Sequence, residues 1–119
     1  MHTVLFHAAF VIEFKALPRA VRIDLAAAVK VLGERGPALG RPHVDTLNGS
    51  RHANMKELRF KSDGGVWRVA FAFDPKRNAI VLVAGDKSGV SEKRFYASLI
   101  ATADTRYDDH LTDLKGATP

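Results

Sequence analysis

Three cationic side chains, Arg59, Arg68 and Lys87, lie in segments where they could share one surface. Side chains alternate between the two faces of a sheet, so Arg68 points away from the apolar face of the run Val66–Phe73. A self-consistent register places all three cations on one side, above small residues. These small residues are Ala70, Ala72 and Gly85. Because guanidinium groups bind phosphate with paired hydrogen bonds, the pattern predicts an open cationic surface suited to a phosphodiester backbone.

An ordinary structural role competes with that interpretation. Arg68 could form a cross-strand ion pair with Glu57, which is common on sheet surfaces and stabilises a fold only slightly. Arg59 and Lys87 could likewise be solvated surface charges. Strand alternation alone leaves both interpretations of Arg68 open.

The segments that must position these cations read as three consecutive strands, Met55–Lys61, Val66–Phe73 and Ala79–Gly85. They are rich in β-branched and aromatic residues. The segments between them, Ser62–Gly65 and Asp74–Asn78, contain the Gly, Pro, Asn and Asp residues that tight turns use. Connections this short predict an antiparallel meander.

The chain before the meander predicts a strand at Thr3–Phe6 and two short helices. Phe10 and Phe14 recur at helical spacing, and Leu17-Pro18 ends the first helix because a proline pushes the preceding residue out of the helical region. Pro18 suits the first turn of the second helix, which ends at Gly33 or Gly36. We expect the two helices to pack as a hairpin on the apolar face of the sheet.

The segment Pro37–Asn54 predicts a long surface loop, because it is rich in Pro, Gly and Asn. It delivers Arg51 and His52 to the edge of the first meander strand. Ser91 is a suitable N-cap for a last helix, in which Tyr96 lies one position off the apolar stripe. The tail, residues 113–119, is expected to fray.

Composition narrows the class of protein. The chain has 119 residues, enough for one domain, and a net charge of +5, which favours a polyanionic or acidic partner. It has no cysteine, which excludes disulfides and thiolate chemistry, and its five histidines lack metal-ligand spacing. No apolar run approaches the roughly 18 residues that span a bilayer, and no secretory leader is recognisable. We therefore expect a cytoplasmic domain that contacts no membrane.

Several short motifs, in order along the chain, resemble the RelE/HigB superfamily of bacterial toxins, closest to its phage-derived HigB-like branch. The motifs are Gly40-Arg41-Pro42-His43-Val44, Met55-Lys56-Glu57-Leu58-Arg59-Phe60, Val66-Trp67-Arg68-Val69-Ala70-Phe71, Gly85-Asp86-Lys87-Ser88-Gly89 and Glu92-Lys93-Arg94-Phe95-Tyr96. The resemblance covers about residues 3–110. It implies an α+β fold, with two N-terminal helices and a C-terminal helix packed on a small twisted antiparallel sheet.

The resemblance also implies an activity and partners. Members of this superfamily are mRNA endonucleases that act on the ribosome and belong to type II toxin–antitoxin systems. The antitoxin of this branch is a helix-turn-helix (HigA-like) protein, and operator DNA is contacted only through it. Cleavage needs no cofactor or metal: the RNA 2′-hydroxyl attacks the adjacent phosphate.

The resemblance assigns roles to residues of this chain. Arg68 would stabilise charge in the transition state, Lys87 would assist it or donate a proton, and Arg59 would contact phosphate. The base stays open between Glu57, Lys56 and His52, since the first strand lacks the two alternating lysines of RelE. Tyr96 is a further catalytic candidate because it lies near the end of the sheet. Other cations expected to contact RNA are Arg51, Lys56, Lys61, Lys93 and Arg94.

Two other functions fit the same scaffold. A ParE-type toxin poisons DNA gyrase through protein contacts and cleaves no RNA. A basic binding module with a degenerate site would not be toxic at all. Because one fold hosts all three, the fold cannot separate them.

Overall fold

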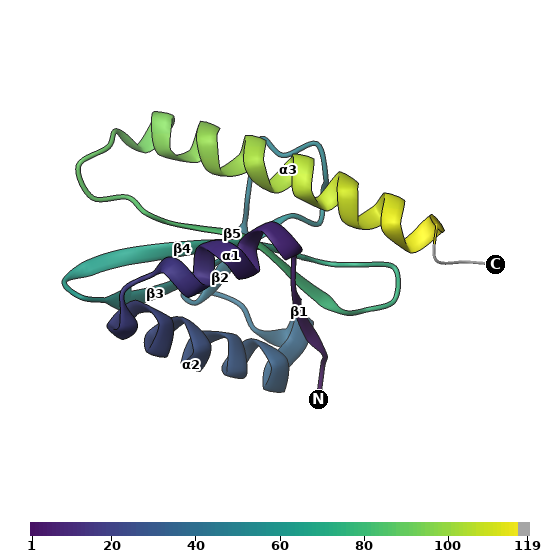
Figure 1. Cartoon of the computed structure of the whole chain (residues 1–119), viewed down its shortest axis with the longest axis horizontal. Helices are drawn as coiled ribbons and strands as arrows, with labels where there is room; N and C mark the ends of the chain where they lie inside the picture. Colours follow the sequence, from purple (N-terminus) through teal and green to yellow (C-terminus); the bar gives the residue numbers. More distant parts are fainter. Residues whose placement is uncertain (117–119) are drawn as a thin grey trace.

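A five-stranded sheet with helices on both faces forms the protein in the computed structural model, which describes residues 1–116 (Figure 1). The strand order is β1-β5-β4-β3-β2. The strands are β1 (Val4–Phe6), β2 (Val44–Thr46), β3 (Lys56–Ser62), β4 (Gly65–Phe73) and β5 (Ala79–Asp86). The helices are α1 (Ala8–Ala16), α2 (Arg19–Arg35), the short 3-10 helix η1 (Gly36–Ala38) and α3 (Glu92–Gly116). The predicted α+β class and the three-stranded meander are confirmed, with strand ends within one residue of those expected.

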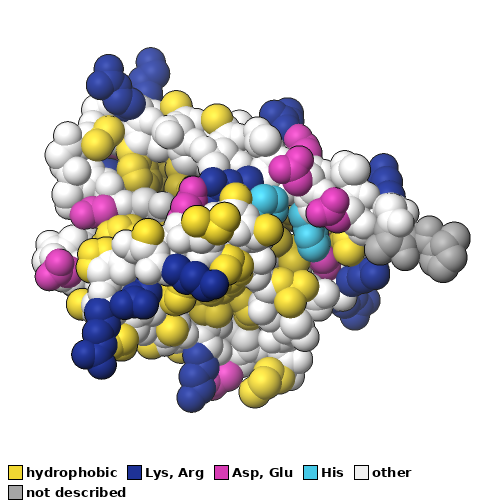
Figure 2. Space-filling view, in the orientation of Figure 1, with side chains coloured by type: hydrophobic (Ala, Val, Ile, Leu, Met, Phe, Trp, Pro, Cys, Tyr) yellow, Lys and Arg dark blue, Asp and Glu magenta, His cyan; other side chains and the backbone are white. Residues whose placement is uncertain are grey.

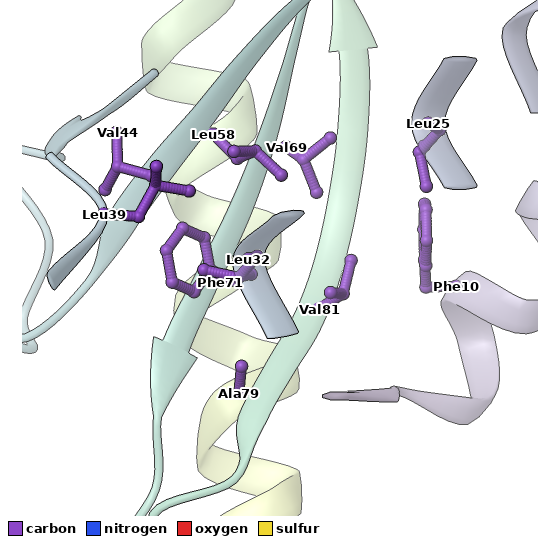
Figure 3. Packing of buried hydrophobic residues seen from close by; sticks show 10 residues of the cluster. All are labelled: Phe10, Leu25, Leu32, Leu39, Val44, Leu58, Val69, Phe71, Ala79 and Val81. Atoms are coloured by element: carbon purple, nitrogen blue, oxygen red, sulfur yellow. The ribbon is translucent and has the colours of Figure 1, made fainter. Parts of the chain in front are cut away.

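Helices α1 and α2 cover one face of the sheet, as predicted. Leu17-Pro18 separates the two helices, and α2 ends at Arg35 with Gly36 as its C-cap. Figure 3 shows the core that they share with the strands, in which side chains from α1 and α2 face those of β3, β4 and β5. Its members include Phe10, Leu25, Leu32, Leu58, Val69, Phe71 and Val81.

Helix α3 covers the other face, which corrects the expectation of an open surface. Ala70 and Ala72 are fully buried there, beneath Phe95, Leu99 and Ala103 of α3. The small side chains therefore make room for a helix rather than for a ligand.

A β-bulge decides which residues of β5 share this face. Ala70 pairs with Val83 and Phe71 with Val81, so Leu82 is an extra residue in β5. The bulge reverses the alternation beyond it, a change that no sequence pattern signals. Ile80 and Gly85 consequently both face α3. A Cβ atom at Gly85 would lie 2.9 Å from Phe95, so this glycine permits the close approach of α3.

One connecting segment and one strand pairing differ from the sequence prediction. The segment predicted as a surface loop forms η1 and strand β2, and it buries Leu39, Val44 and Leu47. This segment has few apolar residues, but they are buried because they pack against the edge of the sheet. Strand β1 pairs in parallel with β5, so the sheet is mostly rather than wholly antiparallel.

Ser91 caps α3 through a hydrogen bond from the Arg94 amide to its hydroxyl, as expected. The helix continues through Gly116, beyond the tail boundary expected near residue 113; residues 117–119 of that tail lie outside the described residues. None of the helices within residues 1–116 combines the length and apolar character needed to cross a bilayer.

Candidate active site

Four side chains from three elements form one hydrogen-bonded group, the Glu57 cluster: Glu57, Arg59, Arg68 and Tyr96. The buried Glu57 Oε1 accepts hydrogen bonds from Arg59 Nε and from the Tyr96 hydroxyl, both at 2.9 Å. Arg68 Nε donates to the Tyr96 oxygen at 2.6 Å and lies 3.6 Å from Glu57 Oε1. The expected cross-strand ion pair of Arg68 is thus present, and it is part of a larger network.

Strand register and one helical turn bring the cluster together. Arg59 and Arg68 are directly opposite each other on β3 and β4, and Arg68 is opposite Gly85 on β5. Tyr96 reaches them from the first turns of α3, and the Arg68 guanidinium lies 5.9 Å from the centre of its ring. Like charges directly opposite repel, so the Glu57 carboxylate between them is what allows two arginines to share this position.

Burial and hydrogen bonding shift the pKa values of two members of the cluster, Tyr96 and Arg59. Burial, followed by the hydrogen bond to Glu57, raises the pKa of the Tyr96 hydroxyl above its ordinary value. The hydrogen bond to Glu57 raises the pKa of Arg59. Tyr96 is therefore a neutral phenol at physiological pH, able to donate one proton while accepting a hydrogen bond from Arg68.

The rim of the cluster contains further charges. Asp45 Oδ2 lies 3.7 Å from Arg59 Nη2 and 3.3 Å from Arg41 Nε. The sequence did not point to Asp45, because its strand β2 was not predicted. The side chain of Arg59 is 37% exposed, against 11% for Arg68, so Arg59 is the more accessible of the two arginines.

Lys87 follows β5 and lies beside the start of α3, where its Nζ is 3.4 Å from Glu92 Oε1. It is not hydrogen-bonded to the Glu57 cluster within the described structure. Lys93 and Arg94 are exposed on the first turn of α3. Lys61 is exposed at the far end of β3, next to the hairpin turn.

Lys56 and His52, two of the three candidate bases, lie away from the cluster. Lys56 donates to Thr46 Oγ1 and is adjacent in β3 to Glu57, so its side chain points to the opposite face of the sheet. His52 Nε2 is 2.8 Å from Asp108 Oδ1, near the middle of α3. Asp108 follows Tyr96 by twelve helical residues, which corresponds to about 18 Å.

The loop before β3 is anchored to α3, a contact that the sequence did not predict. Asp104 accepts hydrogen bonds from the Ser50 hydroxyl at 2.5 Å and from the Arg51 amide at 3.0 Å. Arg51 and His52 also contact the carboxylate of Asp108. We call these five residues the loop latch. No sequence pattern pointed to this latch, because its members lie more than fifty residues apart in the chain.

The Glu57 cluster can bind an oxyanion and move a proton. Two guanidinium groups provide positive charge and hydrogen-bond donors, while Tyr96 and Glu57 form a short chain from a phenol to a carboxylate. Within residues 1–116, no three or more His, Asp or Glu side chains gather in a way that could hold a metal ion.

The fold is similar to that of a small bacterial toxin of known structure. A free-state double arginine-to-alanine mutant of E. coli toxin RelE has the same fold, with a TM-score of 0.59 at 16% identity, covering 84% of this chain and 94% of that chain. At that identity the likeness concerns the fold alone.

Residues 12–108 match the family described as "Phage derived protein Gp49-like", and the chain belongs to that family. Two similar proteins of Mycobacterium tuberculosis are described as candidate toxins. HigB3 is 45% identical over 103 residues, covering 87% of this chain and 88% of HigB3. HigB2 is 50% identical over 94 residues, covering 78% of this chain, but the match spans only 46% of HigB2. The RelE/HigB resemblance of the sequence is confirmed.

Proposed function

We propose that this protein is the toxin of a type II toxin–antitoxin system and cleaves mRNA on the ribosome. The observation that carries the proposal is the Glu57 cluster, in which Arg59 and Arg68 are held side by side against Tyr96. Such a site suits phosphoryl chemistry, and the chain belongs to a family whose similar members are described as toxins.

The reaction is an internal transfer at phosphorus. The 2′-oxygen of a ribose attacks the adjacent phosphate, the bond from phosphorus to the 5′-oxygen breaks, and a 2′,3′-cyclic phosphate and a 5′-hydroxyl form. One proton leaves the 2′-hydroxyl and another joins the departing 5′-oxygen, so the overall charge is unchanged. The fastest route stabilises the extra negative charge on the phosphate oxygens and removes the first proton as attack begins.

Arg59 and Arg68 are the groups suited to the phosphate. Both carry a permanent charge, and their carboxylate partner keeps them fixed before substrate arrives, so little reorganisation is needed during the reaction. Arg59, the more exposed, would contact the incoming phosphate, and Arg68 would stabilise the transition state. Lys87 would add positive charge at the rim and donate the proton to the leaving oxygen when released from Glu92.

Tyr96 and Glu57 are the groups suited to the first proton. The Tyr96 oxygen would take the 2′-hydroxyl proton while the phenolic proton passes to Glu57 Oε1, 2.9 Å away. A neutral tyrosine alone is a weak base, and the carboxylate supplies the basicity. Of the three candidate bases, Glu57 is the one that contacts both arginines, which favours it over Lys56 and His52.

The expected partners follow from the family. Membership of a toxin–antitoxin family implies a cognate antitoxin. We propose a HigA-like helix-turn-helix protein that neutralises the toxin and contacts operator DNA on behalf of the complex. The toxin would act in the cytoplasm, on translated message. The exposed cations Lys93 and Arg94 on α3 would contact the RNA backbone beside the cluster.

The experiment is a message-cleavage assay with purified components, run with and without ribosomes. Primer extension would map new 5′ ends, and end analysis would test for the cyclic phosphate. The Arg68→Ala variant should cut roughly 100-fold or more slowly, because it loses the transition-state charge. Arg19→Ala, an exposed arginine on α2, is the matched control and should cut normally.

Other outcomes would assign another function. Intact message together with induction of the DNA-damage response would indicate a gyrase poison. Absence of any growth defect on expression would indicate a non-toxic binding module. Equal toxicity of the Arg68→Ala variant and the wild type would refute the site assignment.

A further inference from the structure

Arg41 lies at the rim of the Glu57 cluster, on the turn that precedes strand β2. The His43 amide donates a hydrogen bond to the Gly40 carbonyl across this turn. The Arg41 side chain is 80% exposed and forms an ion pair with Asp45, four residues further along the chain. Exposed ion pairs of this kind stabilise a fold very little. The fold therefore needs little from the Arg41 charge.

Asp45 connects Arg41 to the cluster. Strand pairing places Asp45 directly opposite Glu57, on the face of the sheet that also carries Arg59. Its Oδ2 atom lies 3.3 Å from Arg41 Nε and 3.7 Å from Arg59 Nη2. Two arginines from different segments of the chain therefore converge on one carboxylate oxygen.

The other oxygen of Asp45 has a partner within its own strand. Asp45 Oδ1 accepts a hydrogen bond from the Thr46 amide at 2.8 Å. This bond, followed by the charge of Arg41, holds the pKa of Asp45 below its ordinary value. The carboxylate is therefore ionised at physiological pH, and Oδ2 is the oxygen that it directs at the two arginines.

An ionised oxygen between two guanidinium groups resembles a bound phosphate. Guanidinium groups donate to carboxylates and to phosphates in the same paired geometry. Each guanidinium has five N–H donors, so Arg41 and Arg59 have enough of them for an additional anion. The side chain of Asp45 is 25% exposed, so an anion can approach it from solvent. The same two arginines can therefore hold a phosphate oxygen in place of Asp45.

The positions of these side chains fit a row of phosphates. Arg68, Arg59 and Asp45 lie on the neighbouring strands β4, β3 and β2. Adjacent strands are roughly 4.8 Å apart, so Asp45 lies roughly 10 Å from Arg68, a distance that neighbouring phosphates of one RNA strand can bridge between long side chains. Further Lys and Arg side chains project near the start of α3, at the upper left of Figure 2.

We propose that Arg41 is an RNA-binding residue that contacts the backbone phosphate beside the scissile one, and that Asp45 occupies the position of this phosphate in the free protein. The proposal depends on the nuclease function proposed above. Arg59 lies between the two phosphates, and Arg68 stays with the scissile one. Because Asp45 competes with the phosphate, it weakens RNA binding, which is the opposite of what a mere anchor for Arg41 would do.

The first test measures binding without cleavage. The toxin is titrated into a labelled RNA oligonucleotide whose 2′-hydroxyls are methylated, so that it cannot be cut, and fluorescence anisotropy gives the dissociation constant. Arg41→Ala should weaken binding roughly tenfold and lower the slope of log affinity against log salt by about one, because one phosphate contact is lost. Arg41→Lys should retain most of that slope. Arg19→Ala, exposed at the start of α2, is the matched control.

A substitution of Asp45 should have the opposite sign. Asp45→Asn keeps the shape and an oxygen for the Thr46 amide, but it removes the negative charge. RNA binding should become roughly threefold to tenfold tighter, because a like charge beside the phosphate is removed. Asp63→Asn, an exposed carboxylate on the β3–β4 turn, is the matched control and should leave the affinity nearly unchanged.

Cleavage kinetics separate a phosphate contact from a structural role. In the ribosome-dependent assay, Arg41→Ala should raise KM roughly tenfold with little change in kcat, because a contact to a phosphate that does not react is equally strong in the ground state and the transition state. A loss confined to kcat would overturn the proposal. Thermal melting of each variant would show that it is folded.

The alternative results are distinct. Wild-type affinity and salt slope for Arg41→Ala would overturn the proposal, as would failure of the folded wild type to bind the oligonucleotide. Weaker binding by Asp45→Asn would make Asp45 an anchor for Arg41 and would also overturn it. If the wild type binds RNA through Arg41 but cuts no message, the phosphate contact stands and the nuclease function falls.

Discussion

The first turns and the middle of α3 each contact a carboxylate–cation cluster, yet the two clusters differ in charge balance. Around the Glu57 cluster, three arginines meet two carboxylates, which leaves an excess of positive charge. The members of that set are Arg41, Arg59, Arg68, Asp45 and Glu57. In the loop latch, Asp104 and Asp108 face a single arginine and a histidine.

This difference distinguishes the proposed phosphate-binding site from a contact that anchors a loop. A phosphate brings negative charge, so it is favoured where cations exceed their partners and disfavoured where carboxylates do. Arg51 and His52 were predicted to serve RNA binding and catalysis, and both side chains contact Asp108 of α3. A basic residue type near the site is therefore weaker evidence than the balance of partners around it.

Among the changes that compare the two clusters, the largest effect should come from removing the proton acceptor of the Glu57 cluster. Glu57→Gln keeps the shape and one acceptor oxygen but loses the basic carboxylate, so cleavage should fall roughly 100-fold. Asp108→Asn, the same change at the loop latch, should leave the rate unchanged. Single-turnover cleavage of a defined message would measure both. Near-normal cleavage by Glu57→Gln would reduce Glu57 to a positioning residue.

The loop latch should matter for stability instead. Asp104 is 3% exposed and accepts hydrogen bonds from Ser50 and from the Arg51 amide. Asp104→Ala leaves these donors unsatisfied and should lower the free energy of unfolding by about 1–3 kcal/mol. Urea unfolding would measure the loss. Cleavage per folded molecule should stay at the wild-type level, and a large drop would mean that the latch also positions the active site.

A smaller loss of activity is expected for Tyr96→Phe. The ring stays in place against Phe95 and Arg68, but the hydroxyl between Arg68 and Glu57 is removed. Cleavage should slow by roughly tenfold, less than for Glu57→Gln, because a water in the vacated position can still carry the proton to the carboxylate. A loss equal to that of Glu57→Gln would show that the proton must pass through the phenol.

The smallest effect should be the acid sensitivity of the loop latch. The hydrogen bond with His52 holds the pKa of Asp108 below its ordinary value of 3.8. A carboxyl with a lowered pKa stabilises the fold fully above its unfolded value and loses that contribution as the pH falls through the folded value. The difference in melting temperature between wild type and Asp108→Asn should therefore shrink below about pH 4. A constant difference from pH 7 to pH 3 would contradict this assignment.

Much of the fold was predictable because it depends on local patterns. Alternation and turn chemistry gave the strands of the meander, and Leu17-Pro18 marked the break between α1 and α2. Strand β2 was missed because it has only three residues and gains its apolar contacts from the sheet edge rather than from its own pattern. The bulge at Leu82 was equally hidden, since it is a property of the pairing of β4 with β5.

The sequence by itself determined which residue types the candidate site contains. It also determined that Arg59 and Arg68 share one face of the sheet, because side chains alternate between the two faces along each strand. Tertiary structure decided what lies above that face: α3 fills the space over Ala70 and Ala72, and it brings Tyr96 to Glu57. Tertiary structure also placed His52 beside Asp108, away from the Glu57 cluster. The physical reason is that side-chain direction is local to a strand, whereas which helix covers which part of a sheet depends on packing between segments distant in the chain.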